Sequence, residues 1–317
     1  EKSDLFNRVI GDQTDIVNKE MYSWIDHSGD SLALRPELTA PTVRSFIQNN
    51  MDKLRKVNKL YYIGPAFRRE RPQKGRQRQF HQFGVEAIGS ENPEQDAEII
   101  AMSYNIFNML GVENLSLILN SVGSKQTKAK YSKILKQYLT KYINDLSRVS
   151  RERFEKNPLR ILDTKIDKEI EIIREAPSIL ECLDENEKNH FKKVQRYLNK
   201  LNIPFKVDKN LVRGLDYYTL TTFEVRTSNL GSQDALCGGG RYNNLVESLG
   251  GNSMPAFGFA AGMERLLMAL NLDSQENEIK TSVFIISIGE EAILNALKIC
   301  DSLRNQLGIK VLMDFSR

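Results

Sequence analysis

Two stretches with the alternation of β-strands flank a loop that is rich in arginine and lysine. The first, KLYYIGPAFRRE, covers residues 59–70, and the second, QFHQFGVEAIG, covers residues 79–89. Because successive side chains point to opposite faces of a strand, Phe80, Gln82 and Glu86 should share one face. The pattern therefore predicts an antiparallel hairpin with a basic loop and a polar strand face. A solvated hairpin would explain the loop but not the polar face.

Hydrophobic periods predict the order of the remaining elements. A strand precedes a helix that opens near Thr39 and Pro41, with Thr39 as a candidate N-cap. An amphipathic helix ends at Gly111, the short buried strand LSLILNSVG follows, and residues 125 to about 202 have helical periods. Strand patterns return in NLVRGLDYYTLTTFEVRT, in ALCGGGRYNNLVESLGG, where the glycines read as a strand-to-helix turn, and in PAFGFAAGMERLLMAL.

A polar linker, DSQENEIKT, separates this body from a final βαβ pattern. The 317 residues, 40% apolar and 27% charged, fit a globular protein of two or three domains. No apolar run approaches the roughly 18 residues of a membrane helix. A lone βαβ is too short to bury its own core, so we expect an incomplete C-terminal domain, and a first residue other than Met leads us to expect a missing N-terminal segment. The predicted division is 1–122, 123–206, 207–272 and 281–317.

Positive charge is concentrated in the helical stretch. Residues 121–210 contain 21 Lys and Arg against 13 Asp and Glu, a net charge of +8, whereas the whole chain has +4. The rest of the chain is therefore at −4. A basic segment beside an acidic body favours contact with a polyanion, although a solvated helical surface would have the same composition.

Three cysteines and three histidines lie far apart in the sequence. Their spacing matches neither a zinc site nor a disulfide framework, so we expect reduced cysteines of a cytosolic protein. Phosphate-binding P-loop and Rossmann glycine patterns are absent, as are serine-hydrolase and metalloprotease motifs.

Arginines in strand-like or glycine-rich stretches are the remaining chemical signal. Each should be held in a buried ion pair or directed at a phosphate or carboxylate, because the planar guanidinium matches both. Acidic residues lie close to them in sequence, so the set predicts either structural ion pairs or one lined pocket. The arginines are Arg35, Arg68, Arg213, Arg241 and Arg265, and the acids are Glu37, Glu86, Asp216 and Glu264.

Several of these stretches carry a family resemblance. FRRERPQKGRQRQFHQFGVE resembles motif 2 of class II aminoacyl-tRNA synthetases, and GFAAGMERL resembles their motif 3. LVRGLDYYT and GGGRYNNLVE resemble the signatures of the histidyl-tRNA synthetase family, and LRPELTA resembles that family's LRPEGTA. The motifs occur in the family's order and cover the chain from about Leu5 to its end.

The resemblance implies an α+β fold, with a class II antiparallel sheet flanked by helices, a helical insertion and a C-terminal α/β anticodon-binding domain that is incomplete here. It implies a ligase that activates L-histidine with ATP and Mg²⁺ to histidyl adenylate and transfers it to tRNA(His). It also implies a cytoplasmic homodimer without a membrane segment, although the chain begins too late to include motif 1, which builds the family's dimer interface.

The resemblance also implies roles for individual residues. Arg68 and Arg213 would be catalytic, both acting on the α-phosphate. The histidine-binding set would be Glu37, Thr39, Arg68, Gln82, Glu86, Arg213, Tyr217, Tyr218 and Tyr242. The ATP-binding set would be Arg68, Glu70, Phe80 and Arg265, with adenine between Phe80 and Arg265. Lys74, Arg76 and Arg78 of the motif 2 loop would contact tRNA, and no dedicated metal site made by protein side chains is expected.

Two alternatives accompany this prediction. A histidine-sensing regulatory paralogue of a phosphoribosyltransferase would share the core, but the intact LVRGLDYY and the final βαβ favour the enzyme. An RNA-binding module would explain the basic loop and not the inward-facing acids. Leu38 stands where the family pattern has glycine, and this puts the local backbone geometry in question.

Overall fold

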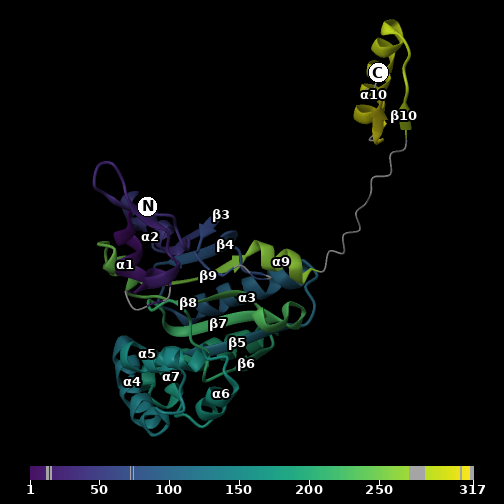
Figure 1. The fold of residues 1–317 in the computed structure, drawn as a ribbon. Coiled ribbons are helices and arrows are strands. Elements are labelled where there is room, and N and C mark those ends of the chain that lie inside the picture. Colours follow the sequence, from purple (N-terminus) through teal and green to yellow (C-terminus); the bar gives the residue numbers. More distant parts are fainter. Residues whose placement is uncertain are drawn as a thin grey trace. The chain divides into compact units, whose positions relative to one another are not determined.

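The computed structural model describes residues 1–11, 14, 16–71, 73, 75–270, 283–307 and 309–314. The chain divides into two compact units, one within Glu1–Leu270 and the other within Asn271–Arg317 (Figure 1). The polar linker predicted at 273–281, and the domain limits at 272 and 281, lie outside the described residues. Among the described helices, none is both long and apolar enough to cross a bilayer.

A seven-stranded sheet forms the centre of the first unit (Figure 1). Neighbouring strands are antiparallel except β5 and β6, which are parallel. The predicted hairpin is confirmed as the pair β3 and β4. In spatial order the strands are β3 (Asn58–Phe67), β4 (Gln79–Ile88), β9 (Ala256–Gly262), β8 (Ala235–Arg241), β7 (Thr219–Thr227), β5 (Leu115–Ser121) and β6 (Phe205–Val207).

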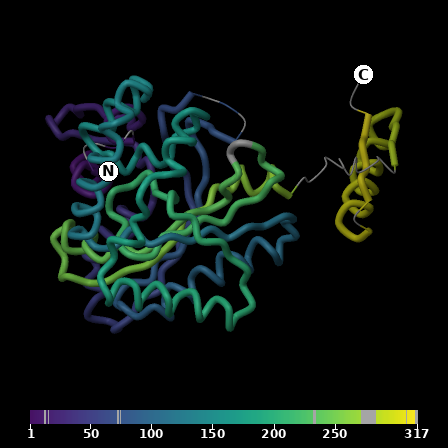
Figure 2. The backbone as a smooth tube through the Cα atoms, turned by 90° about the horizontal axis from the view of Figure 1, so that it is seen from below, coloured from purple at the N-terminus to yellow at the C-terminus, as the bar shows by residue number. Residues whose placement is uncertain are grey.

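Helices α3 (Pro93–Met109) and α7 (Glu185–Lys200) lie side by side against one face of the sheet (Figure 2). Phe83 of β4, Phe223 of β7 and Phe259 of β9 are part of the apolar core on this face. Because side chains alternate, the polar residues of the same strands lie on the opposite face. The predicted α+β fold with an antiparallel sheet flanked by helices is confirmed.

Every element between β5 and β6 is helical, as the sequence predicts. The main helices are α4 (Lys125–Leu139), α5 (Arg148–Lys156), α6 (Asp167–Arg174) and α7, with 3-10 turns at Thr140–Tyr142, Pro158–Asp163 and Ile179–Glu181. Asp184 caps α7 by accepting a hydrogen bond from the Glu187 amide, and Glu187 accepts one from the Asp184 amide.

The remaining elements of the first unit complete the wall around the sheet. They are α1 (Ser3–Ile10), a π-helical turn at Ile16–Glu20, the hairpin β1 (Ser23–Ile25) and β2 (Ser31–Ala33), α2 (Thr39–Gln48), a 3-10 turn at Met51–Lys53, another at Ser228–Gln233, α8 (Leu245–Ser248) and α9 (Met263–Ala269). In the second unit, β10 (Val283–Ile285) and β11 (Val311–Met313) are parallel and α10 (Glu290–Leu307) connects them, which confirms the βαβ pattern.

Thr39 was expected to cap α2, but Leu38 occupies the N-cap position. The carboxylate of Glu37 instead accepts hydrogen bonds from the Thr39 amide at 2.7 Å and the Ala40 amide at 2.9 Å. A carboxylate satisfies the free amides of a helix start as well as a hydroxyl does. The Thr39 side chain is therefore free for a contact elsewhere.

The glycine run of CGGGR was expected to form a turn, but it lies inside β8. A Cβ atom on Gly239 would lie 2.1 Å from the Gly258 carbonyl oxygen of the neighbouring strand. The glycines are therefore required by close packing within the sheet. Arg213, expected in a strand-like stretch, lies in the loop between β6 and β7.

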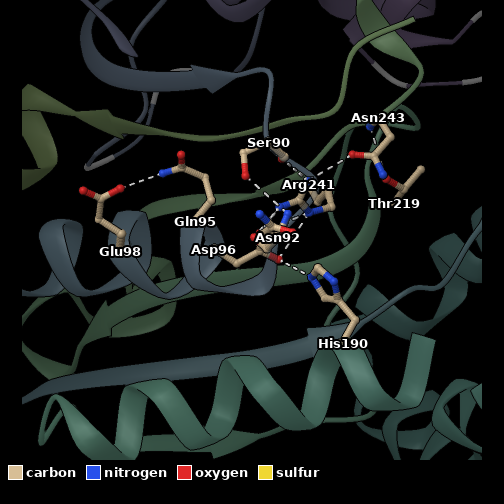
Figure 3. Close-up of polar contacts among 9 residues, drawn as sticks. All are labelled: Ser90, Asn92, Gln95, Asp96, Glu98, His190, Thr219, Arg241 and Asn243. Atoms are coloured by element: carbon tan, nitrogen blue, oxygen red, sulfur yellow. Dashed lines mark hydrogen bonds and ion pairs between the residues drawn. The ribbon is translucent and has the colours of Figure 1, made fainter. Parts of the chain in front are cut away.

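Arg241 was expected among the pocket arginines, but it faces α3 on the opposite side of the sheet. It is fully buried, and its guanidinium donates hydrogen bonds to the Asp96 carboxylate and to the Ser90 and Asn92 carbonyls (Figure 3). His190 Nε2 of α7 contacts Asp96 Oδ2 at 2.8 Å. This cluster joins α3, α7 and β8, so the structural ion-pair alternative is the correct one for Arg241.

We predict that Arg241→Met lowers the free energy of unfolding by about 3–5 kcal/mol, because it leaves the Asp96 carboxylate buried without its cation. Lys59→Met is a matched control. Lys59 of β3 forms an ion pair with Glu98, which is on α3 like Asp96, but both of these side chains are about half exposed. The control should lose less than about 1 kcal/mol. Urea denaturation at neutral pH measures both values, and equal losses would contradict the assignment.

Candidate active site

A cavity of about 510 Å³ lies on the face of the sheet that α3 and α7 leave uncovered. Strands β4, β7, β8 and β9 contribute residues to its wall, together with the start of α2, the loop after β3, the loop before β7 and the start of α9. Eleven of the predicted site residues line it: Glu37, Thr39, Arg68, Glu70, Arg76, Phe80, Gln82, Arg213, Tyr217, Tyr218 and Arg265.

The other predicted residues are placed differently. Glu86 and Tyr242 are buried behind the cavity wall. Arg78 is exposed, and its carbonyl accepts a hydrogen bond from the Arg68 amide at 2.9 Å. Lys74 lies outside the described residues.

Arg68 is fixed at the end of β3. Its Nε donates to the Pro36 carbonyl at 2.8 Å, and its guanidinium lies 5.2 Å from the centre of the Phe80 ring. Arg68 therefore makes a cation–π contact with Phe80, the ring that was expected to stack on adenine. The arginine remains partly accessible from the cavity, so its free donors can reach an anion there.

Arg213 contacts an acid that sequence reasoning missed. Its Nη1 donates to Glu224 Oε1, and Arg226 Nε donates to Glu224 Oε2 at 2.8 Å. Glu224 therefore holds two arginines on the cavity face of β7. The alternation of FEVRT places Glu224 and Arg226 on one face, and this signal could have identified both.

Arg265 is held by backbone carbonyls in the cavity wall. Its Nε donates to the Gly75 carbonyl at 2.9 Å and its Nη1 donates to the Ala235 carbonyl at 3.1 Å. In the same loop as Gly75, Arg76 forms an ion pair with Glu70 at 3.0 Å. The basic loop after β3 thus folds back over the cavity toward α9.

Glu86 is enclosed by hydroxyl groups. Thr39 Oγ1 donates to Glu86 Oε1 at 2.8 Å, and the Tyr242 hydroxyl donates to Glu86 Oε2. The Tyr217 ring packs at 4.7 Å from the Tyr218 ring and 5.6 Å from the Tyr242 ring. A carboxyl group thus lies buried directly behind Thr39, which lines the cavity, and beside the tyrosine cluster.

Burial raises the pKa of Glu86 to about 8, although the hydrogen bonds from Tyr242 and Thr39 oppose this effect. Burial also raises the pKa of Glu37, against the stabilising amide hydrogen bonds of Ala40 and Thr39. A carboxyl group that gains or loses its proton near neutral pH can match either charge state of an imidazole.

Two glycines make room for these side chains. A Cβ atom on Gly258 would lie 1.7 Å from Glu86 Oε2, and one on Gly238 would lie 2.2 Å from the Arg213 guanidinium. A Cβ atom at either position would force the Glu86 carboxyl group or the Arg213 guanidinium to move. The glycines of β8 and β9 therefore create the space in which the two charged groups lie.

Within the described residues, the four predicted acids do not form ion pairs with the arginines near them in sequence: Glu37 accepts from backbone amides and Glu86 from hydroxyl groups. Glu264 accepts hydrogen bonds from the His81 amide at 2.9 and 3.0 Å and contacts the His81 ring, while Asp216 contacts Asn157 on the far side of the loop. Proximity in sequence did not predict these partners because neighbouring side chains of a strand or turn point in different directions. Arg35 donates to the Pro65 carbonyl at 2.7 Å and supports the wall from outside.

Leu38 has a negative φ, with φ −113° and ψ −8°, a conformation open to any L-residue, and is buried. Its side chain occupies space beside Gly64 of β3, where a Cβ atom would lie 3.4 Å from Leu38 Cδ2. The backbone at this position therefore does not require glycine in this chain.

The fold and the cavity together define a class II aminoacyl-tRNA synthetase: an antiparallel sheet whose open face gathers arginines, inward-facing acids and a basic hairpin loop. A family model described as histidyl-tRNA synthetase matches residues 5–266. A histidine–tRNA ligase from Protochlamydia amoebophila is 46% identical over 318 residues, covering 100% of this chain and 75% of the relative. The chain belongs to the histidyl-tRNA synthetase family, and the prediction of a histidine–tRNA ligase is confirmed.

Solved structures agree with this assignment. The apo histidyl-tRNA synthetase of S. aureus is 39% identical, with a TM-score of 0.72, covering 100% of this chain and 75% of that one. A Bacillus halodurans protein described as an ATP phosphoribosyltransferase regulatory subunit/histidyl-tRNA synthetase is 23% identical with a TM-score of 0.67, covering 97% of this chain and 81% of that one. At that identity the second likeness concerns the fold alone.

We predict that Glu86 makes stability depend on pH. Its folded-state pKa lies above the unfolded value, so its contribution to stability is complete below about pH 4.5 and is lost as pH rises through about 8. Relative to Glu86→Gln, the wild type should lose about 1.4 kcal/mol of unfolding free energy per pH unit between pH 5 and 8.

Urea denaturation at several pH values measures this difference. Glu152→Gln, at an exposed position on α5, is the control and should follow the wild-type profile. Parallel profiles for Glu86→Gln and the wild type would show that Glu86 does not retain a proton in the folded protein.

Proposed function

We propose that the cavity binds L-histidine and ATP together, forms histidyl adenylate and then passes the histidyl group to tRNA(His). The observation that carries this proposal is the presence, in one cavity, of Arg68, Arg213 and Arg265 beside the Glu37, Gln82 and tyrosine cluster. The first set suits phosphate, and the second suits an amino acid with an aromatic nitrogen base.

The chemistry needs no general base because the attacking histidine carboxylate is already an anion. One of its oxygens bonds to the α-phosphorus, the bond from that phosphorus to the β-bridging oxygen breaks, and pyrophosphate leaves with the electron pair. Rate acceleration then depends on alignment of the two substrates and on positive charge around the α-phosphate. Arg68 and Arg213, from different elements of the cavity wall, would supply that charge.

The amino-acid side of the cavity suits histidine. Glu37, Thr39 and Gln82 would bind the α-amino group, and Gln82 Oε1 is buried without a hydrogen-bond partner. The imidazole would lie against the tyrosine cluster of Tyr217 and Tyr218 and donate a hydrogen bond to Glu86, whose carboxylate has lone pairs beyond those used by its two hydroxyl partners. An amino acid without a ring N–H would bury its side chain against Glu86 without making this hydrogen bond, which disfavours it relative to histidine.

The nucleotide side would use Arg68, Glu70, Phe80 and Arg265. Glu70, Glu224 and Asp234 line the cavity, and their carboxylate oxygens are donors of the kind that Mg²⁺ prefers, so the site fits the ion. Mg²⁺ bound with ATP would neutralise phosphate charge. Among the described residues, no cluster of three or more His, Cys, Asp and Glu is arranged to hold a metal by protein ligands alone.

The partner proposals rest on charge and exposure. Arg76, Arg78 and Lys74 of the basic loop, together with the basic helices, would contact tRNA phosphates. The sheet edge at β3 exposes Tyr61 and Ile63, which supports a homodimer. We also propose a cytoplasmic location, consistent with three free cysteines, and the division into 1–122, 123–206, 207–272 and 281–317.

We predict that ATP–pyrophosphate exchange catalysed by this protein depends on histidine alone among the twenty amino acids. The enclosed Glu86 is the physical reason, because a ligand with a ring N–H can donate a hydrogen bond to its carboxyl group. Equal exchange with another amino acid would contradict histidine specificity. No exchange with any amino acid, despite histidine binding, would favour a histidine-sensing regulatory protein instead.

We predict that Arg213→Ala lowers kcat for adenylation roughly 100- to 1000-fold, by analogy with removal of one preorganised charge donor. KM for histidine should change much less, because the lost interaction acts mainly in the transition state. The fold should persist, since Glu224 keeps its hydrogen bond from Arg226.

Single-turnover adenylation and a melting curve test this prediction together. Arg151→Ala, an exposed arginine on α5, is the matched control and should behave as the wild type. A folded Arg213→Ala protein with near-normal adenylation would contradict the catalytic role, and a large loss of thermal stability would indicate a structural one.

A further inference from the structure

Residues 209–218, which we call the Arg213 loop, separate two cavities. Arg213, Leu215, Tyr217 and Tyr218 line the active-site cavity on its front. Arg213, Leu215 and Tyr218 also line a second cavity of about 260 Å³ on its back, whose other wall is made by α4 and by residues 156–160. The Arg213 loop is thus a thin wall, and its position sets the shape of the active-site cavity.

Side chains from the helical segment hold this wall from behind. Lys128 of α4 donates from Nζ to the Asp216 carbonyl at 3.2 Å and to the Tyr218 carbonyl at 2.8 Å. Asn157, which follows α5, donates from Nδ2 to Asp216 Oδ1 at 3.2 Å. On the other side, the Asp216 amide donates to the Ile10 carbonyl at 3.3 Å.

The Lys128 contacts flank Tyr217 in the chain. An ammonium group that binds the carbonyls of residues 216 and 218 fixes the 216–217 and 218–219 peptide planes, so residues 217 and 218 are held at both ends. Tyr217 then projects to the front, where it packs against Tyr218 and Tyr242. Burial lowers the pKa of Lys128, and the nearby Asp216 carboxylate opposes that effect.

We propose that Lys128, supported by Asn157, is a positioning residue for adenylation: it holds the Arg213 loop so that Tyr217, Tyr218 and Arg213 face the substrates. The proposal rests on the proposed function of the front cavity. Lys128 itself lies behind the loop and touches neither substrate site, so its effect must pass through the loop.

The ATP side of the cavity should be insensitive to Lys128. Arg68 is fixed by the Pro36 carbonyl, and Arg265 by the carbonyls of Gly75 and Ala235, none of which belongs to the Arg213 loop. Loss of Lys128 should therefore weaken histidine binding and slow adenylation while KM for ATP stays constant. General destabilisation would change all three.

The second cavity provides a conservative variant. Lys128 borders about 260 Å³ of free space, which can accommodate the larger guanidinium of Lys128→Arg. That variant keeps the positive charge and at least two donors for the two carbonyls. Lys128→Met keeps the length of the side chain and removes both donors, and Lys133→Met changes an exposed lysine of the same helix as the control.

The experiment combines hydrogen–deuterium exchange of peptides from the Arg213 loop with ATP–pyrophosphate exchange on the full chain. For Lys128→Met we expect at least about tenfold faster amide exchange in the loop and at least about a tenfold higher KM for histidine, because each of the two lost charge-assisted hydrogen bonds is worth about tenfold or more. KM for ATP and the melting temperature should be unchanged. Lys128→Arg should recover most of both losses, Asn157→Ala should show a smaller effect, and Lys133→Met none.

Wild-type amide exchange in the loop of Lys128→Met would overturn the proposal, as would a Lys128→Arg protein no better than Lys128→Met. A parallel rise in KM for ATP would also overturn it, because it would indicate general damage. If the wild type itself showed no histidine-dependent exchange, the proposed function would fail, and the amide-exchange data would still decide whether Lys128 orders the loop.

Discussion

The buried ion pair between Arg241 and Asp96 determines which face of the sheet meets the helices. Arg241 ends β8, and alternation along that strand places Gly239 on the same face and Gly238 and Gly240 on the other. A shift of β8 by one residue would move an unpaired guanidinium into the active-site cavity, at a cost of several kcal/mol. The register of the central strands, and with it the cavity floor, therefore depends on a contact made on the opposite side of the sheet.

The cavity floor consists largely of backbone because its functional groups approach from elsewhere. The Arg213 guanidinium lies against Gly238, and the Glu86 carboxyl group fills the space above Gly258. Large side chains from a loop and from a neighbouring strand thus lie over glycine positions of β8 and β9, which have no side chains of their own. This arrangement holds charged groups rigidly, since backbone in the middle of a sheet moves less than side chains do.

The sequence predicted the hairpin, the helical segment, the final βαβ and most residues of the cavity wall, because periodicity and family motifs are local signals. It failed where a partner is distant in the chain. Glu224 holds Arg213 and Arg226, Asp216 turns toward the helical segment, and Arg241 finds Asp96 across the sheet. The alternation of side chains along β8 would have placed Arg241 on the face opposite the cavity. Using that signal requires knowing that the glycines lie inside the strand and where the strand starts.

The parallel pairing of β5 and β6 has a topological consequence for the helices between them. Two adjacent parallel strands cannot be joined by a tight turn, since the chain must travel back along the sheet and needs a dozen or more residues to do so. Helices α4 to α7 are therefore the crossover connection of this sheet as well as an elaboration of it. If these helices were removed and replaced by a short turn, β6 could no longer pair in parallel with β5. The amide of Asp208, which directly follows β6, donates a hydrogen bond to the Leu119 carbonyl of β5 at the base of the Arg213 loop. The helical segment from α4 to α7 is therefore an integral part of the catalytic sheet and not a separate module inserted into it.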